Sequence, residues 1–169
     1  AKAKGLPVTA DVAMHQLHLT ESLTDGFNSL AHVRPPLRAE KDKQLLRQGV
    51  KDGVIDAICT HHEPLSSSAK LAPFAETEPG LTAFDTYVAF GVKLVNEGLF
   101  EPLEWVEKVT LAPAKVANMV DRWVEESGWA LVDPKLEWLV SKDSILSQGK
   151  NTPLINQKVV GKVIQTFAA

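Results

Sequence analysis

Apolar and polar positions follow two different patterns along the chain. Up to about residue 126, short β-prone runs alternate with stretches of helical spacing, and after Gly128 only short strand-like runs follow. The β-prone runs of the first part cover residues 6–13, 30–33 and 54–60. The helical stretches cover residues 40–51, 81–96, 102–109 and 113–126, and the late strand-like runs cover residues 129–132, 137–140 and 159–167.

These patterns predict an α/β fold in two parts. Strands that alternate with helices favour parallel βα units over residues 1–126, whereas the late runs favour a small appended β element over residues 127–169. Two consecutive prolines, Pro35 and Pro36, keep the middle β run brief. Three βα units cannot close a barrel, so we expect the open sheet edges to pair with another segment.

Composition is that of one globular domain. The chain has 169 residues, of which 44% are hydrophobic and 23% charged, with a net charge of −3. No basic stripe suggests nucleic-acid binding, and no apolar run is long enough for a membrane span. The single cysteine, Cys59, excludes an internal disulfide and favours a cytoplasmic location. The four tryptophans are expected to be packing residues: Trp105, Trp123, Trp129 and Trp138.

The start of the sequence is typical of a fragment. Residues 1–5, Ala-Lys-Ala-Lys-Gly, have the pattern of a helix end capped by glycine. There is no initiator methionine and no secretory signal. We therefore expect a chain truncated at both ends.

Histidines gather at two predicted strand ends. His15 follows the first β run, and the third run leads into His61, His62 and Glu63, all residue types that bind metals. In an extended segment His61 and Glu63 point one way and His62 the other, so at most two of them converge. The alternative is that His15 and His18 are ordinary strand-end residues with common hydrogen bonds.

Four motifs, in order and in spacing, resemble those of dihydroorotases. Residues 7–17 (PVTADVAMHQL) resemble the family's PVTAEVTPHHL, and residues 33–38 (VRPPLR) resemble VNPPLR. Residues 53–65 (GVIDAICTHHEPL) resemble GTIDAIATDHAPH, and residues 149–153 match a GKNTP turn late in the family's sequence. The resemblance covers nearly the whole chain.

The resemblance implies a fold. Dihydroorotases belong to the amidohydrolase superfamily and fold as a (β/α)8 TIM barrel with a small β domain built from the chain's ends. This sequence would then be the C-terminal part of the barrel, about the last three βα units, plus strands of the small domain. Catalytic residues of such barrels lie at the carboxyl ends of the strands. His15, Arg34 and His61 are at three predicted strand ends of this kind.

The resemblance also implies that catalytic and substrate-binding residues have been replaced. In active relatives a metal-activated water attacks the ring amide of dihydroorotate, and an aspartate after the eighth strand binds metal and carries the proton. That position is His61 here, and Arg34 and Leu65 replace an asparagine and a histidine that contact the substrate. Only His15 keeps its family identity, as the implied metal ligand.

Three replacements in four positions argue against catalysis. A neutral imidazole at His61 can bind zinc or act as a base, but it removes an anion that helps to neutralise two metal ions. No intact catalytic or substrate-binding residue is therefore identified, and no cofactor is expected in this chain, although active relatives use zinc. We expect Arg34 to pair with a carboxylate near the vacated site and so replace the metal's positive charge.

The resemblance suggests a pseudoenzyme of pyrimidine biosynthesis that acts as a structural or regulatory partner of aspartate carbamoyltransferase. The alternative is an active zinc-dependent dihydroorotase, or another cyclic amidohydrolase, that uses His15 and His61 in the full-length protein. A third possibility is a fragment without activity of its own. Self-association, or the missing N-terminal half of the barrel, would cover the open sheet edge.

Overall fold

Two short apolar runs form a parallel sheet. The computed structural model describes residues 1–168, and for residues 123–125 it describes the backbone only. Strands β1 (Asp11–Ala13) and β2 (Ala57–Cys59) pair in parallel, with Val12 opposite Ile58. Each strand is shorter than the run that predicted it, but the parallel pairing agrees with the expected βα units.

The strand predicted at residues 30–33 is absent. Residues Ser29–Ala31 form a 3-10 turn, and the Asn28 side chain accepts a hydrogen bond from the backbone N–H of Leu30 at 3.1 Å. Val33 is buried in a small apolar cluster instead of a sheet. Local turn formation by Asn28 therefore outweighs the β propensity of this run, and β1 pairs directly with β2.

Two helices have the predicted bounds. Helix α1 (Glu40–Lys51) buries Val50, and α3 (Pro102–Val109) begins with a proline and a reciprocal capping box between Glu101 and Glu104. The residues that mark the two helices lie close together in sequence, which explains why the predicted and observed bounds agree. Within residues 1–168, no helix has both the length and the apolar character that crossing a membrane requires.

The other two helical stretches are interrupted. Residues 81–96 become helical only at a 3-10 turn, Phe84–Thr86, which leads into α2 (Tyr87–Asn96). Residues 113–126 belong to two helices, separated by a turn in which Asn118 has a φ of 54°. These helices are α4 (Leu111–Val116) and α5 (Val120–Glu126).

The appended segment is one long antiparallel hairpin. Strand β3 (Trp129–Leu139) pairs with β4 (Lys158–Phe167), so the two runs predicted at 129–132 and 137–140 form a single strand. The expected break is present as an irregularity in register after Asp133. There the Asp133 carboxylate accepts hydrogen bonds from the N–H groups of the second and third residues that follow it.

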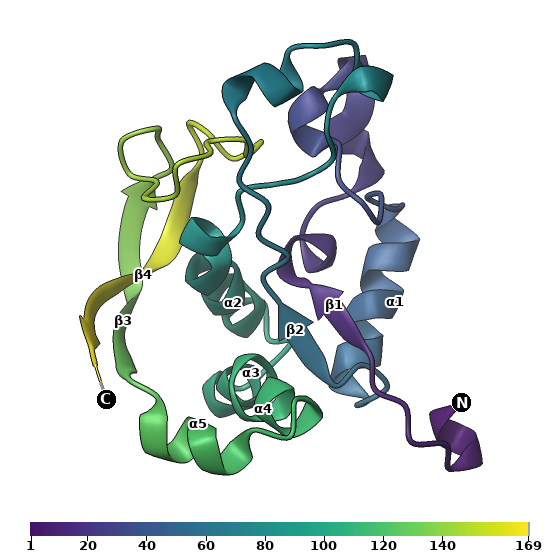
Figure 1. The fold of residues 1–169 in the computed structure, drawn as a ribbon, viewed down its shortest axis with the longest axis vertical. Helices are drawn as coiled ribbons and strands as arrows, with labels where there is room; N and C mark the ends of the chain where they lie inside the picture. The colour runs from purple at the N-terminus through teal and green to yellow at the C-terminus, as the bar shows by residue number, and fades with distance from the viewer. Residues whose placement is uncertain (169) are drawn as a thin grey trace.

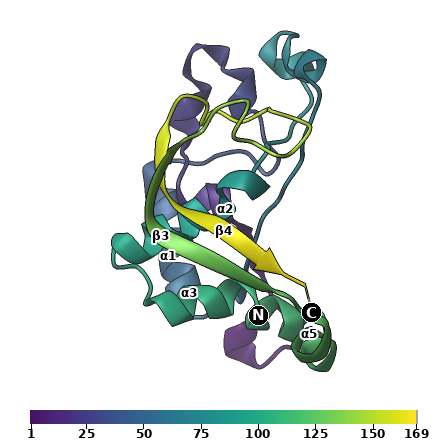
Figure 2. The same ribbon diagram turned by 90° about the vertical axis from the view of Figure 1, so that its left-hand side faces the viewer.

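Helix α2 lies between the two sheets. In Figure 1 one side of α2 faces the β1–β2 pair and the other faces the β3–β4 hairpin, and Figure 2 shows the hairpin crossing in front of α2. The hairpin approaches α2 closely at Gly161, where an added Cβ would lie 2.7 Å from a methyl carbon of Val92. The main core joins both parts of the chain and includes Met14, Ile58, Leu94, Trp105 and Val140.

The tryptophans behave differently from one another. Trp105 is buried and Trp138 is half-buried, with its indole N–H donating to the Gly161 carbonyl at 2.9 Å. The packing prediction is wrong for Trp129, whose side chain is 77% exposed. The Trp123 side chain lies outside the described residues.

His18 is a half-buried histidine whose ring nitrogens are shielded from solvent. Its ring stacks on Phe90 with centroids 4.3 Å apart, and both ring nitrogens are shielded without a hydrogen-bond partner in the described part of the chain. Burial, followed by the positive charges of Arg47 and Lys93, lowers the pKa of His18 to about 3. The ring is therefore a neutral core group.

We expect Gly91→Ala to destabilise the protein by about 1–3 kcal/mol, because the new Cβ would overpack the core. That Cβ would lie 2.0 Å from a ring carbon of Trp105. The matched control is Gly49→Ala in α1, where the nearest atom is the flexible Cδ1 of Ile55 at 3.2 Å. Thermal unfolding of the full-length variants measures both; an unchanged midpoint for Gly91→Ala would show that the helices do not pack in this way.

Stability is expected to fall in acid partly through His18. The folded-state pKa lies below the ordinary value of 6.5, so the unfolded chain binds more protons as the pH falls from about 6.5 towards 3. His18→Leu keeps an apolar contact with Phe90 and removes this titration. Urea unfolding measures the free energy of unfolding at pH 7 and at pH 4.5. The decrease in this free energy between the two pH values should be smaller in the variant by about 2 kcal/mol. If the free energy of unfolding decreases equally in both proteins, the His18 ring is not held neutral in the folded state.

Candidate functional site

His15 and His61 lie together at the carboxyl edge of the parallel pair. His15 follows β1 and His61 follows β2, and their rings meet edge to face with centroids 5.8 Å apart at an angle of 78°. Parallel strands bring their carboxyl ends to one edge, so the sequence order predicts this meeting. Two of the three residues predicted at strand ends are thus in contact.

His15 is the buried member of the pair. Its side chain is 1% exposed, and its Nδ1 has no hydrogen-bond partner among the described residues. Burial, and then the nearby His61, lowers the pKa of His15 to about 4. The ring is therefore neutral near pH 7, the form in which imidazole binds metals.

The segment after β2 places its side chains as predicted, although the backbone at His61 is left-handed (φ 46°) and not extended. His61 Nδ1 lies 3.9 Å from a carboxylate oxygen of Glu63, so these two side chains share one side. The His62 ring lies elsewhere, with Nδ1 accepting from the N–H groups of Ala83 at 3.2 Å and Phe84 at 3.1 Å. His62 therefore caps the turn that leads into α2 and does not join the pair.

Arg34 does not follow a strand, contrary to the prediction. Its side chain is exposed, and among the described side chains no carboxylate forms an ion pair with it. The expected pairing of Arg34 with a carboxylate stays a prediction for the full-length protein. Leu65 is half-buried, and its backbone N–H donates to the side chain of Asn151 at 2.7 Å.

The described residues do not complete a zinc site. Protein zinc sites use three or four ligands, and no group of three His, Cys, Asp or Glu side chains converges in the part of the chain that the structure describes. Cys59 adds no thiolate, because burial and the neighbouring Asp11 raise the pKa of its thiol to about 12. His15 and His61 alone are a pair, and further ligands would have to come from another segment.

A serine, a histidine and an aspartate meet beside the site, a cluster that sequence reasoning missed. The Ser147 hydroxyl donates to Asp85, and the Ser147 oxygen lies 3.5 Å from His62 Nε2. A nucleophilic triad needs the carboxylate on the histidine and the histidine on the serine. Here Asp85 contacts the serine and also accepts from the N–H of Leu146 at 2.6 Å, so the cluster anchors a loop.

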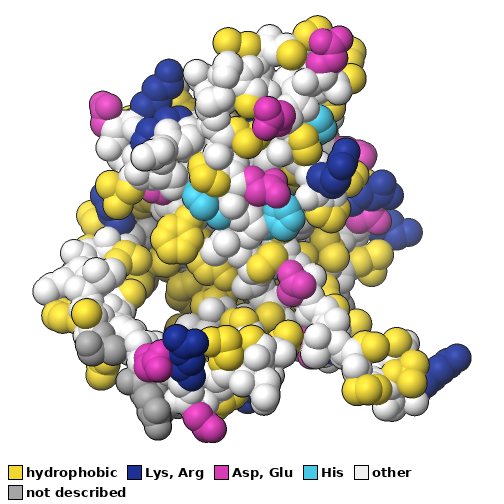
Figure 3. All heavy atoms as spheres, in the orientation of Figure 1, with side chains coloured by type: hydrophobic (Ala, Val, Ile, Leu, Met, Phe, Trp, Pro, Cys, Tyr) yellow, Lys and Arg dark blue, Asp and Glu magenta, His cyan; other side chains and the backbone are white. Residues whose placement is uncertain are grey.

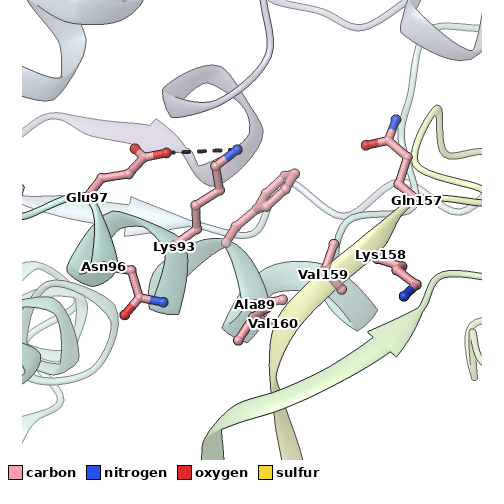
Figure 4. A pocket seen from close by; sticks show the side chains of 9 residues that line it. Ala89, Lys93, Asn96, Glu97, Gln157, Lys158, Val159 and Val160 are labelled. Atoms are coloured by element: carbon pink, nitrogen blue, oxygen red, sulfur yellow. Dashed lines mark ion pairs between the residues drawn. The ribbon is translucent and has the colours of Figure 1, made fainter.

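A separate cavity lies between α2 and the start of β4 (Figure 4). Its volume is about 340 Å³, and its charged groups already have partners: Lys93 pairs with Glu97 at 3.9 Å and Lys158 with Glu137 at 2.8 Å. On the face shown in Figure 3, histidine and acidic side chains gather near the middle, next to apolar ones. Because the charged groups of the cavity are already paired, the contact between His15 and His61 is the better candidate site.

Comparisons with known proteins agree on one family. No family model matches the chain. The chain is 38% identical to a dihydroorotase-like protein of Pseudomonas aeruginosa, 40% identical to one of Pseudomonas putida and 36% identical to a dihydroorotase of Syntrophus aciditrophicus. Each match covers 99% of this chain and 40% of the relative, so the chain spans about two fifths of their length.

Solved structures show the same fold. An L-hydantoinase (dihydropyrimidinase) from Arthrobacter aurescens matches with a TM-score of 0.87 at 18% identity, over 99% of this chain and 39% of its own. A dihydroorotase from Saccharomyces cerevisiae, in complex with 5-fluoroorotic acid, matches with a TM-score of 0.78 at 18% identity, over 100% of this chain and 46% of its own. Over nearly its whole length the chain therefore matches dihydroorotases and dihydroorotase-like proteins, and its fold is that of the C-terminal portion of the solved TIM-barrel proteins.

Proposed function

We propose that the chain is part of a dihydroorotase-like protein of pyrimidine biosynthesis that has lost catalysis and serves as a structural or regulatory partner of aspartate carbamoyltransferase. The relatives at 38% and 40% identity are named dihydroorotase-like proteins, whereas that at 36% is named a dihydroorotase. The proposal concerns the full-length protein, of which this chain supplies the C-terminal portion.

The contact between His15 and His61 carries the proposal. At the position where active relatives place an aspartate, an imidazole meets a second imidazole with centroids 5.8 Å apart. Two imidazole rings supply no anion to balance divalent metal ions, and they offer no carboxylate to carry a proton. The exposed Arg34 and the aliphatic Leu65 also lack the amide and the imidazole expected for substrate contacts.

One observation favours the alternative, an active zinc-dependent cyclic amidohydrolase. Nδ1 of His15 is buried without a partner, although buried polar atoms are nearly always hydrogen-bonded. A metal ion held by further ligands from the rest of the protein would satisfy an unpartnered imidazole nitrogen. In that case His61 would replace the family's aspartate as ligand or base.

Association with the transferase is the first expected outcome. We expect the full-length protein to co-elute with the aspartate carbamoyltransferase of the same organism in size-exclusion chromatography at micromolar concentrations. A catalytically active dihydroorotase from an unrelated bacterium serves as the control for nonspecific binding. Separate elution of the two chains, under conditions in which both are folded, would count against a partner role.

The histidine pair should be dispensable for that role. Replacing both His15 and His61 by alanine should leave the carbamoyltransferase activity of the complex within about twofold of the wild type, because a scaffold has no chemistry at this site. An active amidohydrolase would lose its dihydroorotate turnover by about 100-fold or more in the same variant. Circular dichroism checks that the variant is folded, and a measurable turnover abolished by the substitutions would favour the alternative.

A further inference from the structure

The side chain of Asn151 lies between the two parts of the chain. It is 3% exposed, and its Oδ1 accepts from the N–H of Leu65 at 2.7 Å and lies 2.7 Å from the Thr82 hydroxyl. Its Nδ2 donates to the carbonyls of Glu63 at 3.0 Å and Gly80 at 3.1 Å. One side chain of the appended segment therefore holds two separate loops of the barrel part.

Nearly all of the hydrogen-bonding capacity of this amide is used. Both N–H donors and one lone pair of the carbonyl oxygen have partners of their own, and the second lone pair shares the single hydroxyl proton of Thr82 with the Gly149 carbonyl. Such a pattern fixes the orientation of the amide. It also fixes the two loops relative to each other, since a shift of either would leave a buried polar group unpaired.

Backbone packing at the same place is close. An added Cβ on Gly149 would lie 2.5 Å from the backbone nitrogen of Leu65 and 2.6 Å from its carbonyl oxygen. The N–H of Thr82 donates to the Asn151 carbonyl at 3.0 Å, and the Thr82 hydroxyl lies 2.8 Å from the carbonyl oxygen of Gly149. The turn at 149–153 is therefore seated directly on the two loops.

The turn connects the hairpin to the candidate site. On the hairpin side, Leu154 is buried in the main core and the N–H of Asn156 donates to the Val140 carbonyl at 2.8 Å, so the turn is attached to the ends of the β3–β4 hairpin. On the side of the candidate site, the Asn151 side chain donates to the carbonyl of Glu63, and the carboxylate of Glu63 faces His61. A chain of direct contacts thus runs from the hairpin to the histidine pair.

We infer that Asn151 is a positioning residue that fixes the loop bearing His61 and Glu63, and that it links this loop conformationally to the β3–β4 hairpin. The inference goes beyond the proposed function, because it holds for a scaffold and for an enzyme alike. A molecule that binds the hairpin and shifts the turn would shift the loop, and by linkage a molecule at the histidine pair would alter affinity at the hairpin.

The test is hydrogen exchange in the full-length protein. Asn151→Leu keeps a side chain of similar size and removes all of its polar contacts, so we expect the amide of Leu65 to exchange at least tenfold faster, with no change in α1. The matched control is Thr152→Val in the same turn. Thr152 is fully buried, and within the described residues its hydroxyl accepts only a local bond from the N–H of Leu154 at 3.4 Å.

A second readout reports on the site itself. Carbethoxylation of His61, followed by mass spectrometry, should be faster by threefold or more in Asn151→Leu and unchanged in Thr152→Val, because a freed loop exposes the half-buried ring. Equal exchange at Leu65 and equal labelling of His61 in the two variants would overturn the inference. If Asn151→Leu does not fold, Thr82→Val decides: faster exchange confined to residues 63–65 and 80–82 supports the link, and wild-type exchange there refutes it.

Discussion

The parallel pairing of β1 with β2 is the constraint on which the rest of the structure depends. It sets Val12 opposite Ile58 and brings the carboxyl ends of both strands to one edge, where His15 and His61 meet. The pair is only three residues long on each strand, so helix packing must support it. Helix α2 lies against it on the side of the hairpin, and the shared core runs through all three elements.

Polar contacts specify the surroundings of this edge. His62 caps the turn before α2, Asp85 anchors the loop at Ser147, and Asn151 joins two loops to the appended segment. The loop between residues 61 and 65 is thus held by hydrogen bonds to residues that lie far from it in sequence. Such contacts stabilise one arrangement of a segment that has no regular secondary structure, and breaking those of the buried Asn151 leaves a buried amide unsatisfied.

The sequence predicts the elements whose signals are local. Helix α3 has its capping box and proline within a few residues, and the predicted bounds match the structure. The histidine pair is also predictable, because strand order alone places His15 and His61 at one edge. The positions of Arg34 and Trp129 are not, since a local turn at Ser29–Ala31 replaces the strand expected before Arg34, and the exposure of Trp129 depends on tertiary packing at the end of the hairpin. The role of Asn151 cannot be predicted either. The sequence shows its motif, but its hydrogen-bond partners lie about 70–90 residues away along the chain.

We propose that the full-length protein has lost its catalytic site. Zinc content and dihydroorotate turnover of the full-length protein, measured side by side with an active dihydroorotase, test it most directly. The account predicts zinc well below one ion per chain and no turnover above the blank. Stoichiometric zinc together with measurable turnover would contradict it and would show that the imidazole of His61 can replace the family's aspartate.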